Sequence, residues 1–338
     1  MPRKIRTVLL ALAVVLVLAT LTVVLLVIGQ TPPRPPLPNP NGYDDFLKAG
    51  ALSTRDTGDA PALDQDKLRA LVSTNSESLR LLRLGLTREC ALPADSAMTN
   101  VSGMLSQLAD LKRLAQLLAA EGRLYELDGQ PAAAARSYVD AIHFGNQMSR
   151  GGFIINRLVG IACESIGQVS LSKLMPKLGC EEARLLVAEL EKIDAAAVTW
   201  EEVRKSEKRF AYYQLRQTFN PFAWVIGTWQ SWGSIKRAEM KVKRVEARRR
   251  LLIAELAVRC YQSEQGRAPT GLEQLTPKYL QKVPMDPFSG QSLAYRPNGT
   301  NWLLYSIGED GVDDGGGSRA GRPVSGTASK GDIFYDSP

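Results

Sequence analysis

Residues 7–29 form an uncharged and almost wholly apolar run, which constrains this chain more than any other feature of its sequence. A helix of that length would extend about 34 Å, enough to cross the roughly 30 Å hydrocarbon core of a bilayer. Arg3, Lys4 and Arg6 precede the run, and basic residues favour the cytoplasmic side of a membrane. The sequence therefore predicts a cytoplasmic tail at 1–6, a single-pass transmembrane signal anchor at 7–29 and an extracytoplasmic remainder.

A cleaved signal peptide is the alternative interpretation of the same run. Its apolar region usually spans about 7–15 residues and ends at a small-residue cleavage site. Here the run is longer and ends in VIGQTPP, which favours an uncleaved anchor. The next segment, 30–45, contains TPPRPPLPNPNG, and such proline-rich sequence is typical of a semi-rigid, extended linker. We expect this linker to hold the rest of the chain away from the membrane.

The overall composition is that of a folded protein and excludes several kinds of site. Of the 338 residues, 44% are hydrophobic and 23% are charged, so there is room for two folded units. The single histidine, His143, rules out a metal site built from three histidines. The cysteines are too far apart for a zinc motif or a dense disulfide framework, so we expect most of them to be small buried apolar residues. They are Cys90, Cys163, Cys180 and Cys260.

Residues 46–235 are predicted to form an all-α domain. Apolar residues recur at helical spacing in LADLKRLAQLLAA (108–120) and ARLLVAELEKI (183–193). The sequence between them resembles one tetratricopeptide unit, in which small residues let two antiparallel helices approach and aromatic residues fill the space between them. The matching residues are Gly122, Tyr125, Gly129, Ala134, Tyr138 and Ala141. No second copy occurs at the repeat's period in either direction, so we expect one helical hairpin within a larger helical domain.

Two unusual segments lie around the end of this domain. Residues 219–234, FNPFAWVIGTWQSWGS, hold three of the five tryptophans and a proline. This segment either docks at a membrane interface, where tryptophan is enriched, or forms a loop packed between two domains, and we favour the loop. Residues 236–250, KRAEMKVKRVEARRR, carry much of the net charge of +7. We expect a solvated helix there, with contact to anionic lipid headgroups or acidic polymers as the alternative, and no nucleic-acid partner outside the cytoplasm.

The C-terminal sequence, 236–338, resembles the headgroup of the major, G-type pseudopilin of bacterial type II secretion systems. The resemblance rests on an ordered set of turn, aromatic and acidic residues: Tyr261, Gln265, Gly266, Pro269, Gly271, Leu272, Leu275, Tyr279, Leu280, Pro284, Asp286, Pro287, Gly290, Tyr295, Ser306, Gly308, Asp310, Gly311, Asp332 and Ile333. It implies a long helix packed on a small antiparallel sheet, and a place at the bacterial inner membrane. The local sequence agrees, because SLAYRP and NWLLYSIG flank Asn298-Gly299, a tight-hairpin signal, and DIFYD is a candidate third strand.

The resemblance also implies a calcium site in the loop after the second strand. In the family this loop binds calcium through aspartate side chains and backbone carbonyls, and Ca²⁺ takes about six to eight oxygen ligands. Asp310 matches the loop's first aspartate, and Asp332 matches the aspartate of the closing Asp-Ile pair. The family's acidic residue before that pair is Gly331 here, so Asp313 and Asp314 are the candidates for the missing carboxylate. The alternative is an acidic loop that is only solvated.

The fold predicted from these features is mainly α with an α+β end. A transmembrane helix is followed by an all-α helical-hairpin domain at 46–235 and a pilin-like headgroup at 236–338. The predicted function is that of a non-catalytic, membrane-anchored, extracytoplasmic protein with an unidentified protein partner. Features of a pilus subunit are lacking, because the apolar run contains no glutamate and about 200 residues separate it from the headgroup.

The alternative function is a cell-envelope hydrolase that uses a pair of carboxylates in the helical domain. Glu181-Glu182 and Glu201-Glu202 are adjacent pairs, and adjacent residues on a helix point apart. The chain has no G-x-S-x-G, H-E-x-x-H or phosphate-cradling glycine motif. A pair assembled by the fold, with carboxylates about 5–10 Å apart, would favour a hydrolase. A third interpretation places the protein in a secretion assembly itself.

Overall fold

The computed structural model of this chain describes residues 36–54, 63–93, 101–218, 221–316 and 331–335, with scattered helical residues between 5 and 22. The described part is mainly helical and carries one two-stranded antiparallel sheet, as predicted for the fold class. Within it, no helix is both long enough and apolar enough to span a membrane. Much of the predicted anchor at 7–29 lies outside the described residues.

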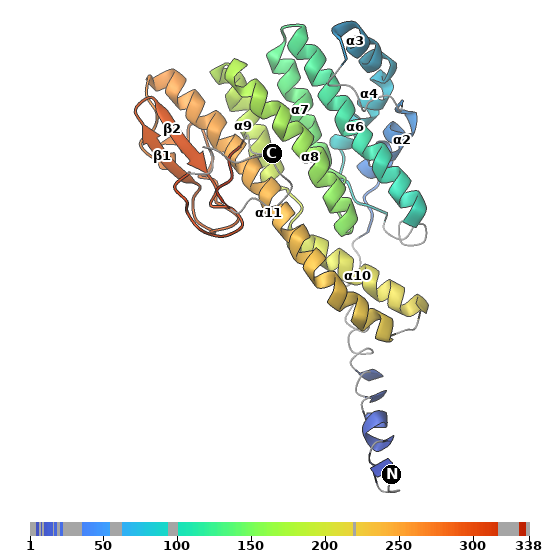
Figure 1. The fold of residues 1–338 in the computed structure, drawn as a ribbon. Helices are drawn as coiled ribbons and strands as arrows, with labels where there is room; N and C mark the ends of the chain where they lie inside the picture. The colour runs from blue at the N-terminus through green and yellow to red at the C-terminus, as the bar shows by residue number, and fades with distance from the viewer. Residues whose placement is uncertain are drawn as a thin grey trace.

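The first part of the chain forms an array of helices that pack side by side (Figure 1). These helices are α2 (Gly42–Leu52), α3 (Gln65–Thr74), α4 (Ser76–Leu86), α6 (Val101–Leu127), α7 (Pro131–Gln147) and α8 (Ile154–Leu174). The rest of the chain comprises η2 (Met175–Lys177), α9 (Cys180–Ala195), α10 (Trp200–Thr218), α11 (Pro221–Gln265), η3 (Leu272–Leu275), β1 (Ala294–Asn298) and β2 (Asn301–Tyr305). The array ends at α9 and α11, and the strands lie on the outer side of α11 (Figure 1).

The predicted helical hairpin is present as α6 and α7. Gly129 closes the turn between the helices with a positive φ of 71°, and Pro131 begins α7, where its missing amide proton leaves no hydrogen bond unmade. Gly122 of α6 lies directly against the ring of Tyr138 on α7, so any larger side chain there would collide with the ring. The small and aromatic residues therefore hold the two helices close together, as the sequence predicts.

Helix α11 is longer than expected and overturns the favoured interpretation of the tryptophan-rich segment. From Pro221 onward the backbone of that segment is helical and continues without a break to Gln265, instead of forming a loop packed between domains. The proline does not prevent this, because at the first helical position it removes no intrahelical hydrogen bond. Together with α10, the start of α11 projects from the array on the side where the described N-terminal residues lie (Figure 1).

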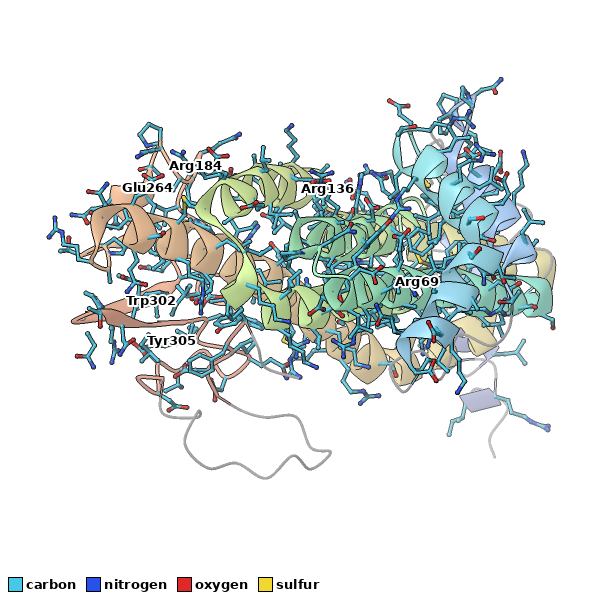
Figure 2. All side chains as sticks on the ribbon, turned by 90° about the horizontal axis from the view of Figure 1, so that it is seen from above. Arg69, Arg136, Arg184, Glu264, Trp302 and Tyr305 are labelled. Atoms are coloured by element: carbon cyan, nitrogen blue, oxygen red, sulfur yellow. A yellow bond between two sulfur atoms is a disulfide. The ribbon has the colours of Figure 1, made fainter. Side chains whose placement is uncertain are left out.

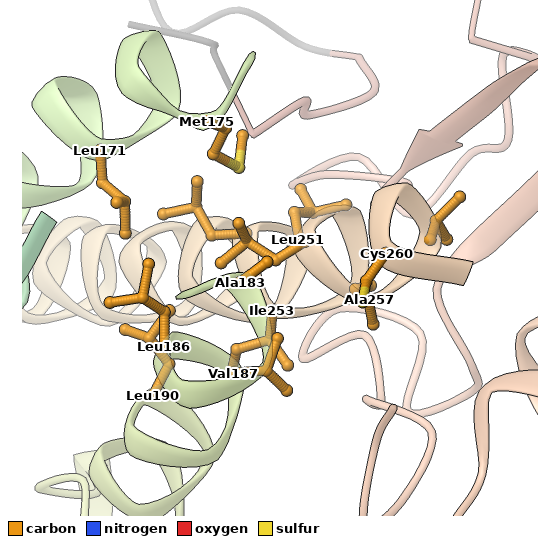
Figure 3. Packing of buried hydrophobic residues seen from close by; sticks show 14 of the residues in the cluster. Leu171, Met175, Ala183, Leu186, Val187, Leu190, Leu251, Ile253, Ala257 and Cys260 are labelled. Carbon is orange, nitrogen blue, oxygen red and sulfur yellow. The ribbon is translucent and has the colours of Figure 1, made fainter. Parts of the chain in front are cut away.

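One hydrophobic core joins the helical array to the C-terminal sheet. It contains residues of α7, α8, α9 and α11 as well as Leu293, Leu304 and Ile333 from the strands and the C-terminal segment. Figure 3 shows the part of this core where Leu186 and Val187 of α9 face Leu251 and Ile253 of α11. The predicted division at 235/236 falls inside α11, and its status as a domain boundary stays a prediction.

The sheet is the predicted hairpin, with β1 and β2 paired from Ala294↔Tyr305 to Asn298↔Asn301. The chain reverses at Gly299, whose φ of 63° suits a tight hairpin turn. The expected third strand is not formed among the described residues, because Ile333 makes only an isolated bridge with Ser306. Trp302 of β2 donates a hydrogen bond from Nε1 to Glu255 of α11 (2.8 Å), and this bond fixes the sheet to the helix.

Candidate functional site

The loop around the predicted calcium ligands is organised by a buried carboxylate, Asp286. Its side chain is 1% exposed and accepts hydrogen bonds from the Phe288 amide, the Ser306 hydroxyl and the Ile307 amide, each at 2.9 Å. Asp286 thus joins the turn before β1 to the end of β2. Sequence analysis identified Asp286 as part of a turn but did not predict that it holds the following loop in place.

Asp313, one of the four predicted ligands, is already bound on both of its oxygens. Oδ1 accepts hydrogen bonds from the Tyr305 hydroxyl (2.6 Å) and the Gly315 amide (2.8 Å), and Oδ2 pairs with Arg296 (2.9 Å). The hydrogen bonds from Tyr305 and the Gly315 amide and the charge of Arg296 lower the pKa of Asp313, and together they outweigh the opposing effect of burial. Both oxygens of Asp313 therefore have partners within the chain.

The other predicted ligands are divided between two places. Asp332 is buried and accepts a hydrogen bond from the Gly316 amide (2.7 Å). Its burial raises its pKa, and the nearby charges of Asp313 and Asp314 add to this, so these three carboxylates lie in the same neighbourhood. Asp310 is exposed and turns back to its own loop, where it accepts a hydrogen bond from the Val312 amide (3.2 Å).

Among the described residues, no group of potential side-chain metal ligands includes the four predicted aspartates. Within the described part of the chain, the one group of three potential side-chain ligands whose atoms lie within 4.8 Å of each other is Cys180, Cys260 and Glu264, and none of the four aspartates belongs to it. The two cysteines of that group form a disulfide, which removes them as metal ligands. The calcium site stays a prediction.

A disulfide between Cys180 and Cys260 corrects the expectation that most cysteines are simple apolar residues. It joins the first residue of α9 to the last turns of α11, across 80 residues of sequence and a Cα–Cα distance of 4.8 Å. Cys90 and Cys163 are free and buried, as predicted. No spacing motif marks the disulfide pair in the sequence, because the two cysteines meet only when α9 packs on α11.

Beside the disulfide, Arg184 of α9 lies 3.6 Å from Glu264 of α11, and Figure 2 shows both side chains at the same end of the molecule. In the same view, Trp302 and Tyr305 lie in the strand layer on one side of α11. Tyr279 also reaches this end and donates a hydrogen bond to Glu264 (2.7 Å). This end of the molecule is therefore held by a covalent bond and by exposed polar contacts.

A second set of contacts missed by sequence analysis is a buried ionic network at the junction of α8, α9 and α11. Glu164 is fully buried and pairs with Arg157 of its own helix and with Arg249 of α11 (2.8 Å). Arg249 also contacts Asp194 of α9 (2.7 Å), which Arg250 reaches as well (3.1 Å). Burial lowers the pKa of Arg249, but the two carboxylates outweigh this effect and raise it. The network fixes α11 against the helical array.

The carboxylate pairs considered for a hydrolase are not brought together as a catalytic pair. Glu202 is engaged at the start of α10, where it accepts from the Thr199 amide (3.0 Å) while its own amide donates to Thr199 Oγ1 (3.2 Å). Glu181, Glu182 and Glu201 are exposed.

The buried acids of the helical array are held by arginines instead: Glu121 and Asp140 pair with Arg83. His143 contacts Gln147 (3.1 Å), and burial and the charge of Arg150 lower the pKa of His143. Each of these groups therefore has a neighbouring side chain as its partner.

The chain was compared with known protein families, characterised proteins and solved structures. No family, no characterised protein and no solved structure matches it. The resemblances to a pseudopilin headgroup and to a tetratricopeptide unit accordingly remain predictions from the sequence.

Proposed function

We propose that this chain is a membrane-anchored extracytoplasmic protein without a catalytic role. The observation that carries the proposal is the disulfide between Cys180 and Cys260, because disulfides persist in oxidising compartments and are rare in the cytosol. The uncharged run at 7–29 would supply the anchor, and the basic residues before it favour a cytoplasmic N-terminus.

The finer part of the proposal is that α11 and the sheet form a pseudopilin-like headgroup carried by a helical partner-binding domain. Three features support it: α11 lies along the hairpin, Trp302 fixes the sheet to α11, and the Asp286-Pro287 turn precedes β1. Two features depart from the expected pattern, since Ile333 forms a single bridge and Asp313 is paired with Arg296. We therefore leave calcium out of the proposed function, and no observation favours the hydrolase.

The experiment that tests location is a count of free thiols in the cell. Cells that express the full chain are quenched in acid, denatured, and treated with a maleimide reagent large enough to shift the protein on a gel. We expect two labelled cysteines, Cys90 and Cys163, and four after reduction. A Cys180→Ser, Cys260→Ser variant should show two labelled cysteines under both conditions.

Four labelled cysteines without reduction would contradict an oxidising location. Membrane attachment is measured in the same cells by extraction at alkaline pH, which removes peripheral proteins and leaves integral ones in the pellet. We expect the chain in the pellet. Its release into the supernatant would contradict the anchor at 7–29, whatever the thiol count shows.

A further inference from the structure

A cavity of about 710 Å³ opens between the helical array and α10. It is lined by the segment that follows α4, by the end of α7 at Gln147 and Arg150, and by one face of α10. Pro36 and Pro38 of the linker also line it. The cavity therefore lies where the linker joins the array, on the side from which α10 and the start of α11 project (Figure 1).

Four basic side chains line this cavity, namely Arg88, Arg150, Lys205 and Arg209. Arg88 is compensated, because its guanidinium pairs with the buried carboxylate of Asp45 at 2.6 Å. Of the two acids in the lining, Glu202 is engaged at the start of α10, and Glu89 is exposed. The cavity thus has more positive than negative charge available to a ligand.

Lys205 and Arg209 are the least compensated of these cations. They lie four residues apart on α10 and so share one face of the helix. The Nε of Arg209 is buried and has no hydrogen-bond partner in the described part of the chain. Lys205 has only a long contact, 3.8 Å, with the exposed Glu201. Among the described residues, neither cation is therefore paired with a buried carboxylate.

Arg150 supplies a third positive charge from the opposite wall. Its guanidinium donates to neutral oxygens only, the Ala196 carbonyl (2.6 Å) and the Gln147 side chain (3.4 Å). Its charge is therefore not cancelled by a carboxylate. The one thiol in the lining, Cys90, is buried, and burial raises its pKa to about 12, so the cavity lacks a reactive nucleophile at that position.

We propose that this cavity binds a phosphate group, held by Lys205 and Arg209 on α10 and attracted by Arg150 across from them. Guanidinium and ammonium groups are the usual protein ligands of phosphate, and the arginine fork matches two of its oxygens. The group could belong to free phosphate or to the headgroup of an anionic phospholipid. The lipid source rests on the proposed function, because it requires the linker side of the array to face a membrane.

The site is tested by titrating inorganic phosphate into the full chain in a neutral detergent, with chloride at matched ionic strength as the blank. We expect binding to the wild type and a Kd at least about tenfold higher for Arg209→Gln, since a charge-assisted hydrogen bond is lost. Lys205→Gln should also weaken binding. Lys208→Gln is the matched control, because Lys208 lies on the same helix, is exposed and does not line the cavity.

An unchanged Kd for both Arg209→Gln and Lys205→Gln, or no phosphate binding by the wild type, would overturn the proposal. An effect of Lys208→Gln as large as that of Arg209→Gln would overturn it too, because binding would then follow net charge. Circular dichroism of each variant shows whether the helices remain, and either α10 variant suffices if the other fails to fold.

The two sources are separated in bilayer discs. If a lipid headgroup fills the cavity, discs that contain phosphatidylglycerol should raise the apparent Kd for phosphate at least about tenfold over discs of phosphatidylcholine alone. If the source is free phosphate, the two values should agree. Both results support the site, and both are independent of the alkaline extraction, so failure of the anchor would not be mistaken for failure of the site.

Discussion

Two adjacent arginines on α11 are both buried, but only one of them pairs with carboxylates. Arg249 is 1% exposed and faces the helical array, where Glu164 and Asp194 bind it. Arg248 is 6% exposed, and among the described residues its Nε has no hydrogen-bond partner and no carboxylate pairs with it. Burial and the charge of Arg244 lower the pKa of Arg248 to about 10. Arg249 therefore has anionic partners, and Arg248 has none among the described residues, although Arg244 one turn earlier pairs with Glu309.

This difference indicates which contacts determine the fold. A buried charge is tolerated when its partners are buried with it, and it is destabilising when they are absent. The contacts of Arg249 require α8, α9 and α11 to meet in one arrangement, so they select that arrangement. Arg248 has no such partners among the described residues, so its charge does not favour one arrangement of the helices over another. Removing a partner of Arg249 should therefore destabilise the protein, whereas removing the charge of Arg248 should stabilise it.

The largest effect should come from removing the carboxylate of Glu164, which Arg157 and Arg249 share. Glu164→Gln keeps the shape of the side chain but leaves Arg157 buried without its anionic partner and Arg249 with Asp194 alone. We expect the free energy of unfolding to fall by about 3–5 kcal/mol. Urea denaturation of the full chain measures it, with the exposed Glu181→Gln as control. A loss below about 1 kcal/mol would contradict the network's role.

The disulfide between Cys180 and Cys260 also joins α9 to α11, near the C-terminal end of α11. Cys180→Ser should lower the free energy of unfolding by about 2–5 kcal/mol, since the closed loop no longer restricts the unfolded chain. The measurement is urea denaturation without reductant. Adding dithiothreitol to the wild type should produce a loss of the same size, and reductant should not change the variant. A variant as stable as the wild type would show that α9 needs no covalent link to α11.

Substitution of Arg248, by contrast, should stabilise the protein. Arg248→Met removes a buried charge that lacks a carboxylate and keeps an unbranched side chain of similar length. We expect the free energy of unfolding to rise by about 1–3 kcal/mol. Arg249→Met should instead be strongly destabilising in the same assay. If both substitutions destabilise the protein equally, the proposed difference between the charges of Arg248 and Arg249 is wrong.

Acid titration should separate Asp194, in the network, from Asp332, in the acidic loop. Burial raises the pKa of Asp194, but Arg249 and Arg250 outweigh this and hold it below its usual value of about 3.9. The stability that Asp194 contributes is therefore present above the unfolded-state pKa and is lost as the pH falls through the folded-state pKa. Asp332 has a raised pKa, so its contribution is present at low pH and is lost as the pH rises.

Urea denaturation between about pH 3 and pH 7 measures both slopes. Asp194→Asn should reduce the loss of stability toward acid pH. Asp332→Asn should reduce the decline that accompanies rising pH above about 4. Slopes of the same sign at the two sites would mean that burial and the neighbouring charges do not disfavour the ionised form of Asp332.

The smallest effect concerns calcium. Because Asp313 is occupied by Arg296 and Tyr305, we expect the unfolding temperature of the full chain to be the same in EDTA and in millimolar calcium. A rise of several degrees would restore the predicted calcium site, since saturation at one hundred times Kd adds about 2.7 kcal/mol. Asp310→Ala and Asp332→Ala would then have to abolish the gain. Arg296→Gln is the informative companion, because it frees Asp313 for a cation.

Local features of the fold could be predicted from the sequence because local patterns determine them. Helical periodicity indicated helices within α6 and α9, the resemblance to a tetratricopeptide unit indicated the α6–α7 hairpin, and Asn298-Gly299 indicated the turn of the β hairpin. Contacts between distant residues carry no such pattern. The bond between Cys180 and Cys260, the pairing of Arg249 with Glu164, and the use of Asp313 by Arg296 all depend on how complete elements pack.

The candidate sites followed the same division. Sequence analysis found the acidic residues Asp310, Asp313, Asp314 and Asp332, because charged residues clustered among glycines are visible in one short segment. It could not tell that Arg296 on β1 would reach Asp313. Nor did it find the basic cavity, since Arg150, in the turn after α7, and Arg209, on α10, meet only in the folded chain.

The unbroken length of α11 has a mechanical consequence. At about 1.5 Å per residue, its 45 residues make a rod about 68 Å long, with the α10 contacts near one end and the sheet near the other. The network at Arg249 and the disulfide at Cys260 both tie the C-terminal part of this rod to α9. Any displacement of the sheet together with α11 would therefore have to carry α9 with it.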